Sequence, residues 1–166
     1  MTYRLLKGNL LECDQDLIVI PVNMKGIAGA GLAKAAKFKY PRWYDSYVRF
    51  THEGRWEQCS FHVYQQVWDP GYIVSLPTKT TWRLPSDIEL IRKGLTELKW
   101  YVTREDIKMF ALPLLGCGLG GLDPNDVLEV IDEVFNGRYW PHVYVMPNDA
   151  GRIKNDDHYD GIRFAS

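Results

Sequence analysis

Short apolar segments recur along the chain, and polar or turn-forming residues separate them. Each segment is rich in aliphatic and aromatic residues and has Gly, Pro, Asn, Asp or Ser nearby. This pattern is typical of buried β-strands. The sequence therefore predicts strands over Tyr3–Lys7, Leu17–Val22, Phe61–Gln66, Tyr72–Leu76, Lys108–Leu114 and His142–Met146.

Between the strands, apolar residues recur at the spacing expected for the buried face of a helix. One helix is predicted to begin at Ser86, because Ser86 and Glu89 have the spacing of a capping box. Another is predicted from Asp123, its cap, to Gly137. Two more are predicted over Leu32–Lys39 and Trp43–Glu53, and the core side chains expected from the Ser86 helix are Ile88, Ile91, Leu95, Leu98 and Val102.

Strands that alternate with helices predict an α/β sandwich with a largely parallel sheet. A chain of 166 residues is long enough for one such domain with a full core. The segment after Pro147 is polar. We interpret residues 148–166 as a tail that packs on, or extends from, a domain formed by residues 1–147.

Two glycine-rich segments directly follow predicted strands. Residues 116–121 join the strand Lys108–Leu114 to the helix at Asp123, and Gly26–Gly31 follow the strand Leu17–Val22. Glycine lets a backbone approach a ligand closely, and uncovered N–H groups suit a phosphate. One such loop often serves tight packing alone, whereas two at strand ends could clamp a diphosphate.

A third loop, Pro77–Arg83, follows the strand Tyr72–Leu76. In largely parallel sheets, ligands bind beyond the carboxyl ends of the strands, so all three loops belong at one edge. This loop contributes Lys79, beside hydroxyl groups and an indole. Because a lysine in a loop is commonly just solvated, its position alone leaves a chemical role open.

Composition and charge mainly exclude some classes of function. A net charge of −1 gives no electrostatic basis for strong nonspecific binding to DNA or membranes. The sequence has no signal-peptide pattern and no apolar run of membrane-spanning length. Widely spaced Cys13, Cys59 and Cys117 argue for reduced thiols in the cytoplasm. The histidines show no metal-ligand spacing, so we expect no metal site.

Four segments resemble the macrodomain family, whose modules bind ADP-ribose. They are Lys7-Gly8-Asn9-Leu10-Leu11, Pro21-Val22-Asn23, Gly29-Ala30-Gly31-Leu32-Ala33 and the loop from Leu115 to Asp123. The resemblance runs from about Tyr3 to Met146 and implies a three-layer α/β/α sandwich with a mixed, largely parallel central sheet. The loop Leu76–Arg83, followed by Pro85-Ser86, resembles the branch that contains the DarG antitoxin and the human terminal ADP-ribose glycohydrolase.

The resemblance implies which residues would contact each part of the ligand. Asn9, where the family has an acid, and Leu10 would meet the adenine, with Met146 and Asn148 at its border. Asn23 would lie near the distal ribose. The residues implied around the diphosphate and distal ribose are Gly29, Ala30, Gly31, Leu32, Pro77, Thr78, Gly116, Cys117, Gly118, Leu119 and Gly120.

Lys79 aligns with the catalytic lysine of this branch. The human enzyme also uses an aspartate at the position that is Gly120 here, whereas DarG-like enzymes have glycine there. The resemblance therefore implies that Lys79 acts without that acid. It would either attack or trap the opened sugar, or stabilise the leaving group as a charge.

The implied function is that of an ADP-ribosyl hydrolase that removes ADP-ribose from thymidine in DNA or from carboxylates in protein. We expect it to be a cytoplasmic monomer without a cofactor. A non-catalytic ADP-ribose-binding module and an ADP-ribose 1″-phosphate phosphatase remain alternatives. A nicotinamide-dependent dehydrogenase is disfavoured, because Gly29–Lys34 lacks the third glycine of the dinucleotide motif.

Overall fold

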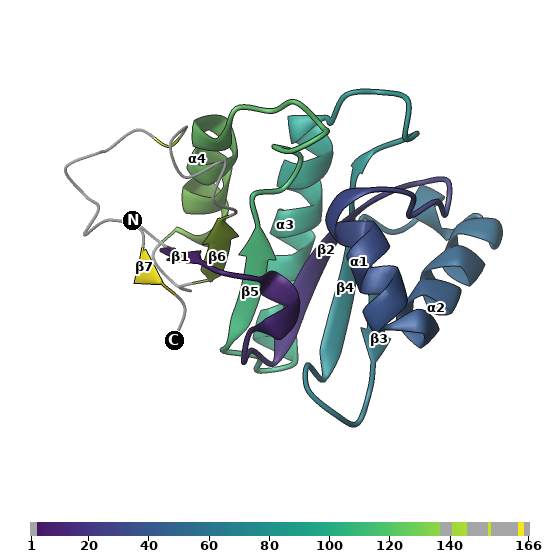
Figure 1. Ribbon diagram of the computed structural model, residues 1–166, viewed down its shortest axis with the longest axis horizontal. Helices are drawn as coiled ribbons and strands as arrows, with labels where there is room; N and C mark the ends of the chain where they lie inside the picture. The colour runs from purple at the N-terminus through teal and green to yellow at the C-terminus, as the bar shows by residue number, and fades with distance from the viewer. Residues whose placement is uncertain (1–2, 137–140, 146–152, 154–162, 165–166) are drawn as a thin grey trace.

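The computed structural model describes residues 3–136, 141–145, 153 and 163–164. Within them, one sheet has the strand order β3-β4-β2-β5-β6-β1-β7 (Figure 1). Neighbouring strands are parallel except for β3 and β4, which are antiparallel. The strands are β1 (Arg4–Lys7), β2 (Leu17–Asn23), β3 (His62–Gln65), β4 (Tyr72–Lys79), β5 (Phe110–Pro113), β6 (His142–Val145) and β7 (Arg163–Phe164).

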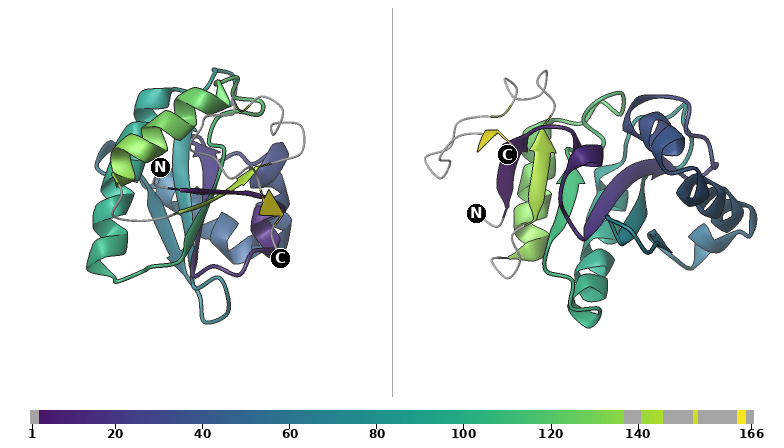
Figure 2. Two further views of the ribbon diagram at one scale, coloured as in Figure 1. Left: turned by 90° about the vertical axis from the view of Figure 1, so that its left-hand side faces the viewer. Right: turned by 60° about the horizontal axis from the view of Figure 1, so that its bottom comes forward.

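Helices cover both faces of this sheet, as the edge-on view in Figure 2 shows. Helices α3 and α4 lie on one face, and α1 and α2 lie on the other (Figure 1). The α-helices are α1 (Gly31–Lys39), α2 (Pro41–His52), α3 (Ile88–Arg104) and α4 (Pro124–Phe135), with two short 3-10 turns at Leu10–Glu12 and Arg55–Glu57. The three-layer α/β/α sandwich is therefore confirmed.

The central strands are apolar at consecutive positions because both of their faces are buried. In β2, Leu17 and Val19 pack with the α3 and α4 side chains, whereas Ile18 and Ile20 pack with Trp43 on the other face. Successive side chains of a strand point to opposite faces, so one continuous apolar run supplies two cores. These cores fix the strand ends from which the loops at one edge of the sheet emerge.

The structure corrects the predicted end of β4. Pro77 and Thr78 lie inside the strand, which continues to Lys79 instead of ending at Leu76. Strand β3 pairs with β4 only as far as Ser75, whereas β2 remains paired with β4 beyond that point. A proline is tolerated there because one side of β4 no longer has a strand partner. Lys79 is thus held by the sheet instead of standing in a free loop.

The predicted capping box at Ser86 is also wrong. The cap of α3 is Asp87, whose Oδ1 accepts a hydrogen bond of 2.9 Å from the Glu89 N–H. Ser86 is buried, and its own N–H donates to the Gly120 carbonyl oxygen at 3.0 Å. The hydroxyl of Ser86 donates to Thr78 Oγ1 of β4, so Ser86 holds the end of β4 while Asp87 caps the helix.

The two ends of α4 compare differently with the sequence. Asp123 caps the helix and Pro124 occupies its first turn, as predicted. The helix ends at Phe135, and Asn136 takes the left-handed conformation with φ 51°. Gly137, the predicted end, lies outside the described residues.

Strand β7, which pairs with β1, was not predicted from the sequence. No helix among the described residues has the length and apolarity that a membrane span needs.

Candidate functional site

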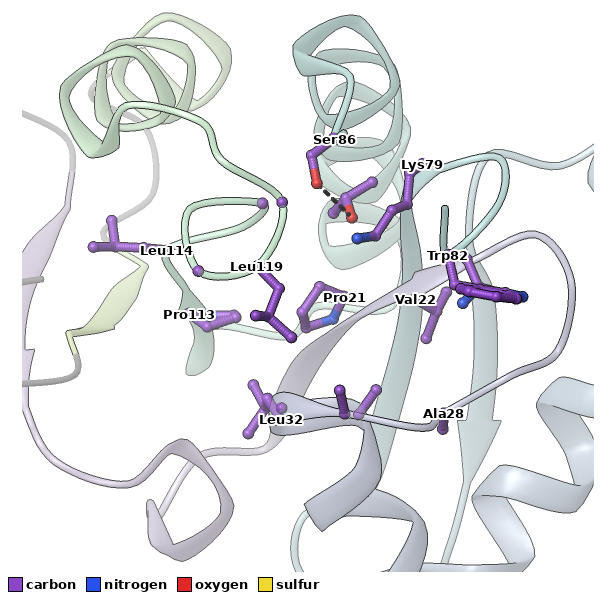
Figure 3. Close-up of a pocket in the computed structure, with 18 of the residues that line it drawn as sticks. Pro21, Val22, Ala28, Leu32, Lys79, Trp82, Ser86, Pro113, Leu114 and Leu119 are labelled. Carbon is purple, nitrogen blue, oxygen red and sulfur yellow. Dashed lines mark hydrogen bonds between the residues drawn. The ribbon is translucent and has the colours of Figure 1, made fainter. Parts of the chain in front are cut away.

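A cavity of about 1190 Å³ lies at the carboxyl ends of the parallel strands. Loops that follow β1, β2, β4 and β5 line it, as does Tyr144 of β6. Figure 3 shows side chains from β2, β4, β5 and the loops that follow them around the cavity. Parallel strands all end at the same edge, which is why loops far apart in the sequence meet here. Most of the lining is backbone or apolar side chain. Its charged members among the described residues are Lys79 and Arg83.

The loop after β5 exposes backbone to this cavity. It folds on itself through hydrogen bonds from Leu122 N–H to Gly116 O (3.0 Å) and from Gly121 N–H to Gly118 O (3.3 Å). Gly116 and Gly121 have φ of 74° and 78°, a region that favours glycine. A Cβ added at Gly118 would have nothing within 4 Å. Because Gly118 lines the cavity, that open space is where a ligand would lie.

Cys117 belongs to this loop but does not line the cavity. Its side chain is buried, and its thiol contacts the Leu115 carbonyl oxygen at 3.5 Å. The predicted ligand contact therefore falls outside the cavity wall, and the thiol is a small core side chain. Leu119, by contrast, projects from the loop and is 80% exposed. Figure 3 shows it over the middle of the cavity.

Asn23 shapes the loop after β2. Its Oδ1 accepts from the Lys25 N–H at 2.9 Å, and its Nδ2 donates to the Ile27 carbonyl oxygen at 2.8 Å. The Tyr47 hydroxyl donates to the Asn23 carbonyl oxygen. Asn23 lines the cavity as predicted from the resemblance, but its side chain is already engaged in holding the loop. Its predicted contact with a distal ribose stays a prediction.

Helix α1 points its amino terminus at the cavity. Gly31, Leu32 and Ala33 line the wall, and their N–H groups precede the first intrahelical bond, from Lys34 N–H to Ala30 O. Ala30 offers no side chain to cap them. Uncapped N–H groups and the positive end of the helix dipole favour an anion. Gly29 and Ala30, both predicted contacts, line the same stretch.

Strand β4 brings Lys79 to the cavity from the other side of β2. Lys79 is half-buried, and Figure 3 shows its amine directed into the cavity. No side chain or carbonyl of the described residues forms an ion pair or hydrogen bond with that amine. Thr78 lines the cavity next to it, whereas Pro77 is buried in the strand and does not. An amine that no described residue engages is available to a ligand.

Ser86 links the end of β4 to the glycine loop after β5. Its hydroxyl donates to Thr78 Oγ1 at 3.4 Å, while its N–H donates to Gly120 O. The Thr78 carbonyl oxygen accepts from the Asp87 N–H at 2.7 Å. These contacts fix Lys79 relative to the glycine loop. They also fill the space beside Gly120, where an added Cβ would overlap Ser86 Oγ and lie 2.5 Å from Gly116 O.

The opposite end of the cavity is apolar and neutral. Leu10 and Leu11 are buried there, and Asn9 Oδ1 accepts from the Leu11 N–H at 3.0 Å. Burial raises the pKa of the Tyr144 phenol and so further disfavours its charged form. A flat, uncharged ring suits such a wall. Asn9 and Leu10 line it as predicted. Met146 and Asn148, also predicted there, lie outside the described residues.

Several lining residues were missed by the sequence analysis. The sequence analysis named Trp82 and Arg83 only as part of the loop that carries the family resemblance, and not as ligand contacts. An indole so close to Lys79 in the sequence could have indicated that Trp82 lines the same cavity. Most of the others directly adjoin the predicted loops, so a wider reading of each loop would have found them. The missed residues are Gly8, Leu11, Pro21, Val22, Ile27, Ala28, Ala33, Ala35, Trp82, Arg83, Leu84, Pro85, Ser86, Pro113, Leu114, Gly121 and Tyr144. Within the part of the chain that the structure describes, no three His, Cys, Asp or Glu side chains group as metal ligands do.

The sheet order, the helix-terminal N–H groups and the two glycine loops define an α/β protein with a cavity at its strand ends whose lining suits an anion. Residues 19–131 match the Macro domain family. The chain therefore belongs to the macrodomain family, as the resemblance of its loops indicated.

Two kinds of relative refine this assignment. The chain is 34% identical over 144 residues to a Thermus aquaticus protein named DNA ADP-ribosyl glycohydrolase. The alignment covers 86% of this chain and 40% of that protein. The macrodomain of Thermus aquaticus DarG superposes with a TM-score of 0.78 and 34% identity, covering 87% of this chain and 97% of that one. Thermosipho africanus DarTG in complex with ADP-ribose gives a TM-score of 0.76 and 25% identity, covering 90% and 42%. This chain thus spans less than half the length of the Thermus aquaticus glycohydrolase.

Proposed function

We propose that this chain binds ADP-ribose in the cavity and hydrolyses the bond that joins ADP-ribose to thymidine in DNA. The observation that carries the proposal is the amine of Lys79, which points into the cavity and has no ion-pair partner among the described residues. The similarity to DNA ADP-ribosyl glycohydrolases and to a DarTG structure that holds ADP-ribose supports the choice of ligand and bond.

The diphosphate would lie between the amino terminus of α1 and the glycine loop after β5. Both supply N–H groups without bulky side chains, and such groups neutralise phosphate without a basic cluster. This accounts for a phosphate ligand in a chain whose net charge is −1. Gly118 faces open cavity and allows the closest approach.

The adenine would occupy the neutral end beside Leu10 and Tyr144. Asn9 stands where the family has an acid, and its Oδ1 already caps the turn at Leu11. An amide oxygen has two lone pairs, so Asn9 can accept from the adenine amino group while it keeps this cap. The distal ribose would then lie toward Asn23 and Lys79 at the other end.

Lys79 would act on the anomeric carbon of the distal ribose. In its neutral form the amine attacks the anomeric carbon, the bond from this carbon to the thymine nitrogen breaks, and the departing nitrogen takes the proton that the amine loses. The ribose ring then opens to give an imine, which water hydrolyses to ADP-ribose and the free amine. In its charged form the ammonium stabilises the departing group. Ser86 and the Gly116 carbonyl fill the space beside Gly120, so an acidic side chain would not fit at this position. The reaction would therefore rely on the lysine and on water.

We further propose that the protein acts as a cytoplasmic monomer. Cys13, Cys59 and Cys117 are thiols and not members of disulfides, which favours a reducing compartment. A single chain supplies every described wall of the cavity, so the site needs no second copy. Light scattering after gel filtration would report the mass in solution, and a stable dimer would contradict this assignment.

The first prediction concerns Lys79→Ala and separates binding from chemistry. Phosphates and adenine are held by other atoms, so ADP-ribose should bind within about threefold of the unchanged protein. Release from an ADP-ribosylated thymidine oligonucleotide should fall by about 100-fold or more, because the lost amine acts on the transition state. Calorimetry measures the first quantity and mass spectrometry of released ADP-ribose the second.

Lys99→Ala is the matched control, since Lys99 lies on α3 and its amine donates to the Val134 carbonyl oxygen, away from the cavity. A glutamate-linked ADP-ribosyl protein tests the other bond. If the unchanged protein binds ADP-ribose and releases it from neither substrate, the chain is a binding module and the proposed hydrolysis is wrong.

A further inference from the structure

A buried phenol of α2 reaches the end of β2 at Asn23. Tyr47 is fully buried, and its hydroxyl lies within hydrogen-bond distance of both oxygens of Asn23, the carbonyl oxygen and Oδ1, the latter at 3.3 Å. Burial raises the pKa of this phenol, which further favours the protonated form that donates. Tyr47 does not line the cavity, so an influence of its hydroxyl on a ligand has to pass through Asn23, which does.

The donors around Asn23 determine the orientation of its side-chain amide. Oδ1 accepts from the Lys25 N–H at 2.9 Å, and the Tyr47 hydroxyl approaches the same atom. Because both groups are donors, the atom that they share is the amide oxygen, and the NH₂ group lies on the other side. One N–H of that group donates to the Ile27 carbonyl oxygen at 2.8 Å. The second N–H forms no hydrogen bond with a described residue, and since Asn23 lines the cavity, this N–H is available to a ligand.

A bulge in the pairing of β2 with β4 places Asn23 beside Lys79. Val22 pairs with Pro77, whereas Asn23 pairs with Lys79, so Thr78 has no pairing partner on β2. With regular pairing, Asn23 would lie opposite Thr78 instead. Bulges near ligand sites redirect side chains in this way. Asn23 and Lys79 therefore both line the same end of the cavity, where Figure 3 shows Val22 and Lys79.

Ring contacts hold the Tyr47 phenol in one position. Its ring stacks on Trp43 with centroids 5.9 Å apart and an interplanar angle of 6°, and the Trp56 ring contacts it edge-on with centroids 6.4 Å apart. Trp43 Nε1–H in turn donates to Ser75 Oγ of β4 at 2.9 Å. The phenol is thus fixed to the sheet before a ligand binds, and an amide that it orients in advance loses little entropy on binding.

We propose that Tyr47 is a positioning residue: its hydroxyl orients the Asn23 amide so that the second N–H donates to a hydroxyl group of the distal ribose beside Lys79. This inference rests on the proposed function, which places the distal ribose at that end of the cavity. The donated bond fixes the anomeric carbon relative to the Lys79 amine. Without the phenol, the amide can rotate, and its donor leaves the position that the ribose hydroxyl needs.

The first measurement compares ADP-ribose with ADP, which has the adenine and the diphosphate but lacks the distal ribose. By calorimetry, the unchanged protein should bind ADP-ribose more tightly than ADP. Tyr47→Phe keeps the ring contacts and removes the hydroxyl. It should lower the ratio of the two affinities about 3- to 10-fold, the range for one lost hydrogen bond, while the affinity for ADP changes little. An unchanged ratio in a folded Tyr47→Phe protein would overturn the inference.

Tyr44→Phe is the matched control. The Tyr44 hydroxyl donates to the Gly26 carbonyl oxygen at 3.0 Å, in the same loop but without contact to the Asn23 amide. This variant loses one bond from a phenol to the loop and should leave the ratio of affinities unchanged. An equal fall of the ratio in Tyr44→Phe would assign the effect to the loop as a whole and would contradict a specific role of Tyr47.

A double-mutant cycle tests whether Tyr47 acts through Asn23. Asn23→Ala should lower the ratio of affinities at least as far as Tyr47→Phe does. Adding Tyr47→Phe to Asn23→Ala should lower it no further, because the amide that the phenol orients is already gone. Losses that multiply would show that the phenol acts through the stability of the fold, which would also overturn the inference.

Turnover of an ADP-ribosylated thymidine oligonucleotide gives a second readout. Tyr47→Phe should lower kcat about 10-fold or more, because a ribose that is held loosely reaches the Lys79 amine less often in the reactive geometry. A higher KM with an unchanged kcat would contradict the positioning role.

Failure of the proposed function gives different results. If the unchanged protein binds ADP-ribose but releases it from no substrate, the proposed hydrolysis is wrong, and the ratio of affinities still decides the role of Tyr47. If the unchanged protein binds neither ADP-ribose nor ADP, the proposed function fails and this inference fails with it.

Discussion

Glycines of the same loop have different roles at the scale of single residues. A Cβ at Gly118 would project into open cavity, whereas a Cβ at Gly116 would lie 2.9 Å from both Ser86 Cβ and Leu122 Cδ1. Gly116 also has a φ of 74°, whereas Gly118 is not among the glycines with a positive φ. One glycine therefore keeps space for a ligand, and the other keeps the loop folded.

The second prediction uses this contrast. Gly118→Val should fold normally and weaken ADP-ribose binding by about 100-fold or more, because the isopropyl group occupies ligand space. Gly116→Val should instead destabilise the fold by about 2 kcal/mol, which lowers the melting temperature by about 4–8 °C for a chain of this size. Calorimetry and thermal melting of both variants check the pair. Undiminished binding in a folded Gly118→Val protein would show that ADP-ribose lies elsewhere.

The third prediction concerns Gly120, the position that the family resemblance aligns with an aspartate of the human enzyme. A side chain at this position would overlap Ser86 Oγ and press on Gly116 O. Gly120→Asp should therefore lower both the melting temperature and ADP-ribose affinity, the latter about tenfold or more, instead of adding a useful acid. Ser86→Gly in the same chain should restore only part of the loss, since the Gly116 carbonyl remains. Full activity of Gly120→Asp alone would mean that the loop adapts freely.

At the scale of elements, the sequence predicted which segments are strands and helices better than where they end. The apolar runs at β2 and β5 are strong signals because these strands are buried on both faces. Lys79 was expected in a loop, since Pro77 breaks most strands. Only the pairing of β3, which stops at Ser75, makes a proline acceptable there. That information lies in the sheet and not in the residues around Pro77.

A buried polar chain connects α2 with β3 and β4. His62 is buried, its Nδ1 lies 2.9 Å from Ser75 Oγ, and its Nε2 lies 2.8 Å from Ser46 Oγ. Trp43 Nε1–H donates to the same Ser75 Oγ at 2.9 Å. Ser75 can then donate to a neutral His62. Burial lowers the pKa of His62 from 6.5 to about 4, with a smaller effect from the Arg55 charge.

The fourth prediction follows from this lowered pKa. An unfolded His62 takes up a proton near pH 6.5, whereas the folded one stays neutral until about pH 4. The stability due to neutral His62 is therefore complete above pH 6.5 and is lost as the pH falls toward 4, by up to about 3 kcal/mol. The difference in unfolding free energy between the unchanged protein and His62→Gln should shrink over this range. A constant difference for His62→Gln would contradict the prediction.

At the scale of the whole molecule, the site depends on strand order, which no local pattern of the sequence reveals. The glycine loops were predictable because each directly follows an apolar strand. Their distance from Lys79 was not, because β4, β2 and β5 are adjacent only in the folded sheet. Ser86, which holds these loops together, was read as a helix cap because its contacts with Thr78 and Gly120 arise only after folding.

The last prediction concerns how the charges of the molecule are distributed. The net charge is −1, and the charged residues that line the described cavity are Lys79 and Arg83. In Lys79→Ala, which leaves the substrate intact for a binding measurement, Arg83 is the cation left at that wall. An ADP-ribosylated single strand should then bind with a salt dependence that exceeds that of free ADP-ribose by a logarithmic slope of about 0.7, the value for one phosphate contact. Adding Arg83→Gln should remove the difference. Anisotropy titrations over a range of salt concentrations measure both slopes, and a difference of several units would require a wider cationic surface than the one that Arg83 provides.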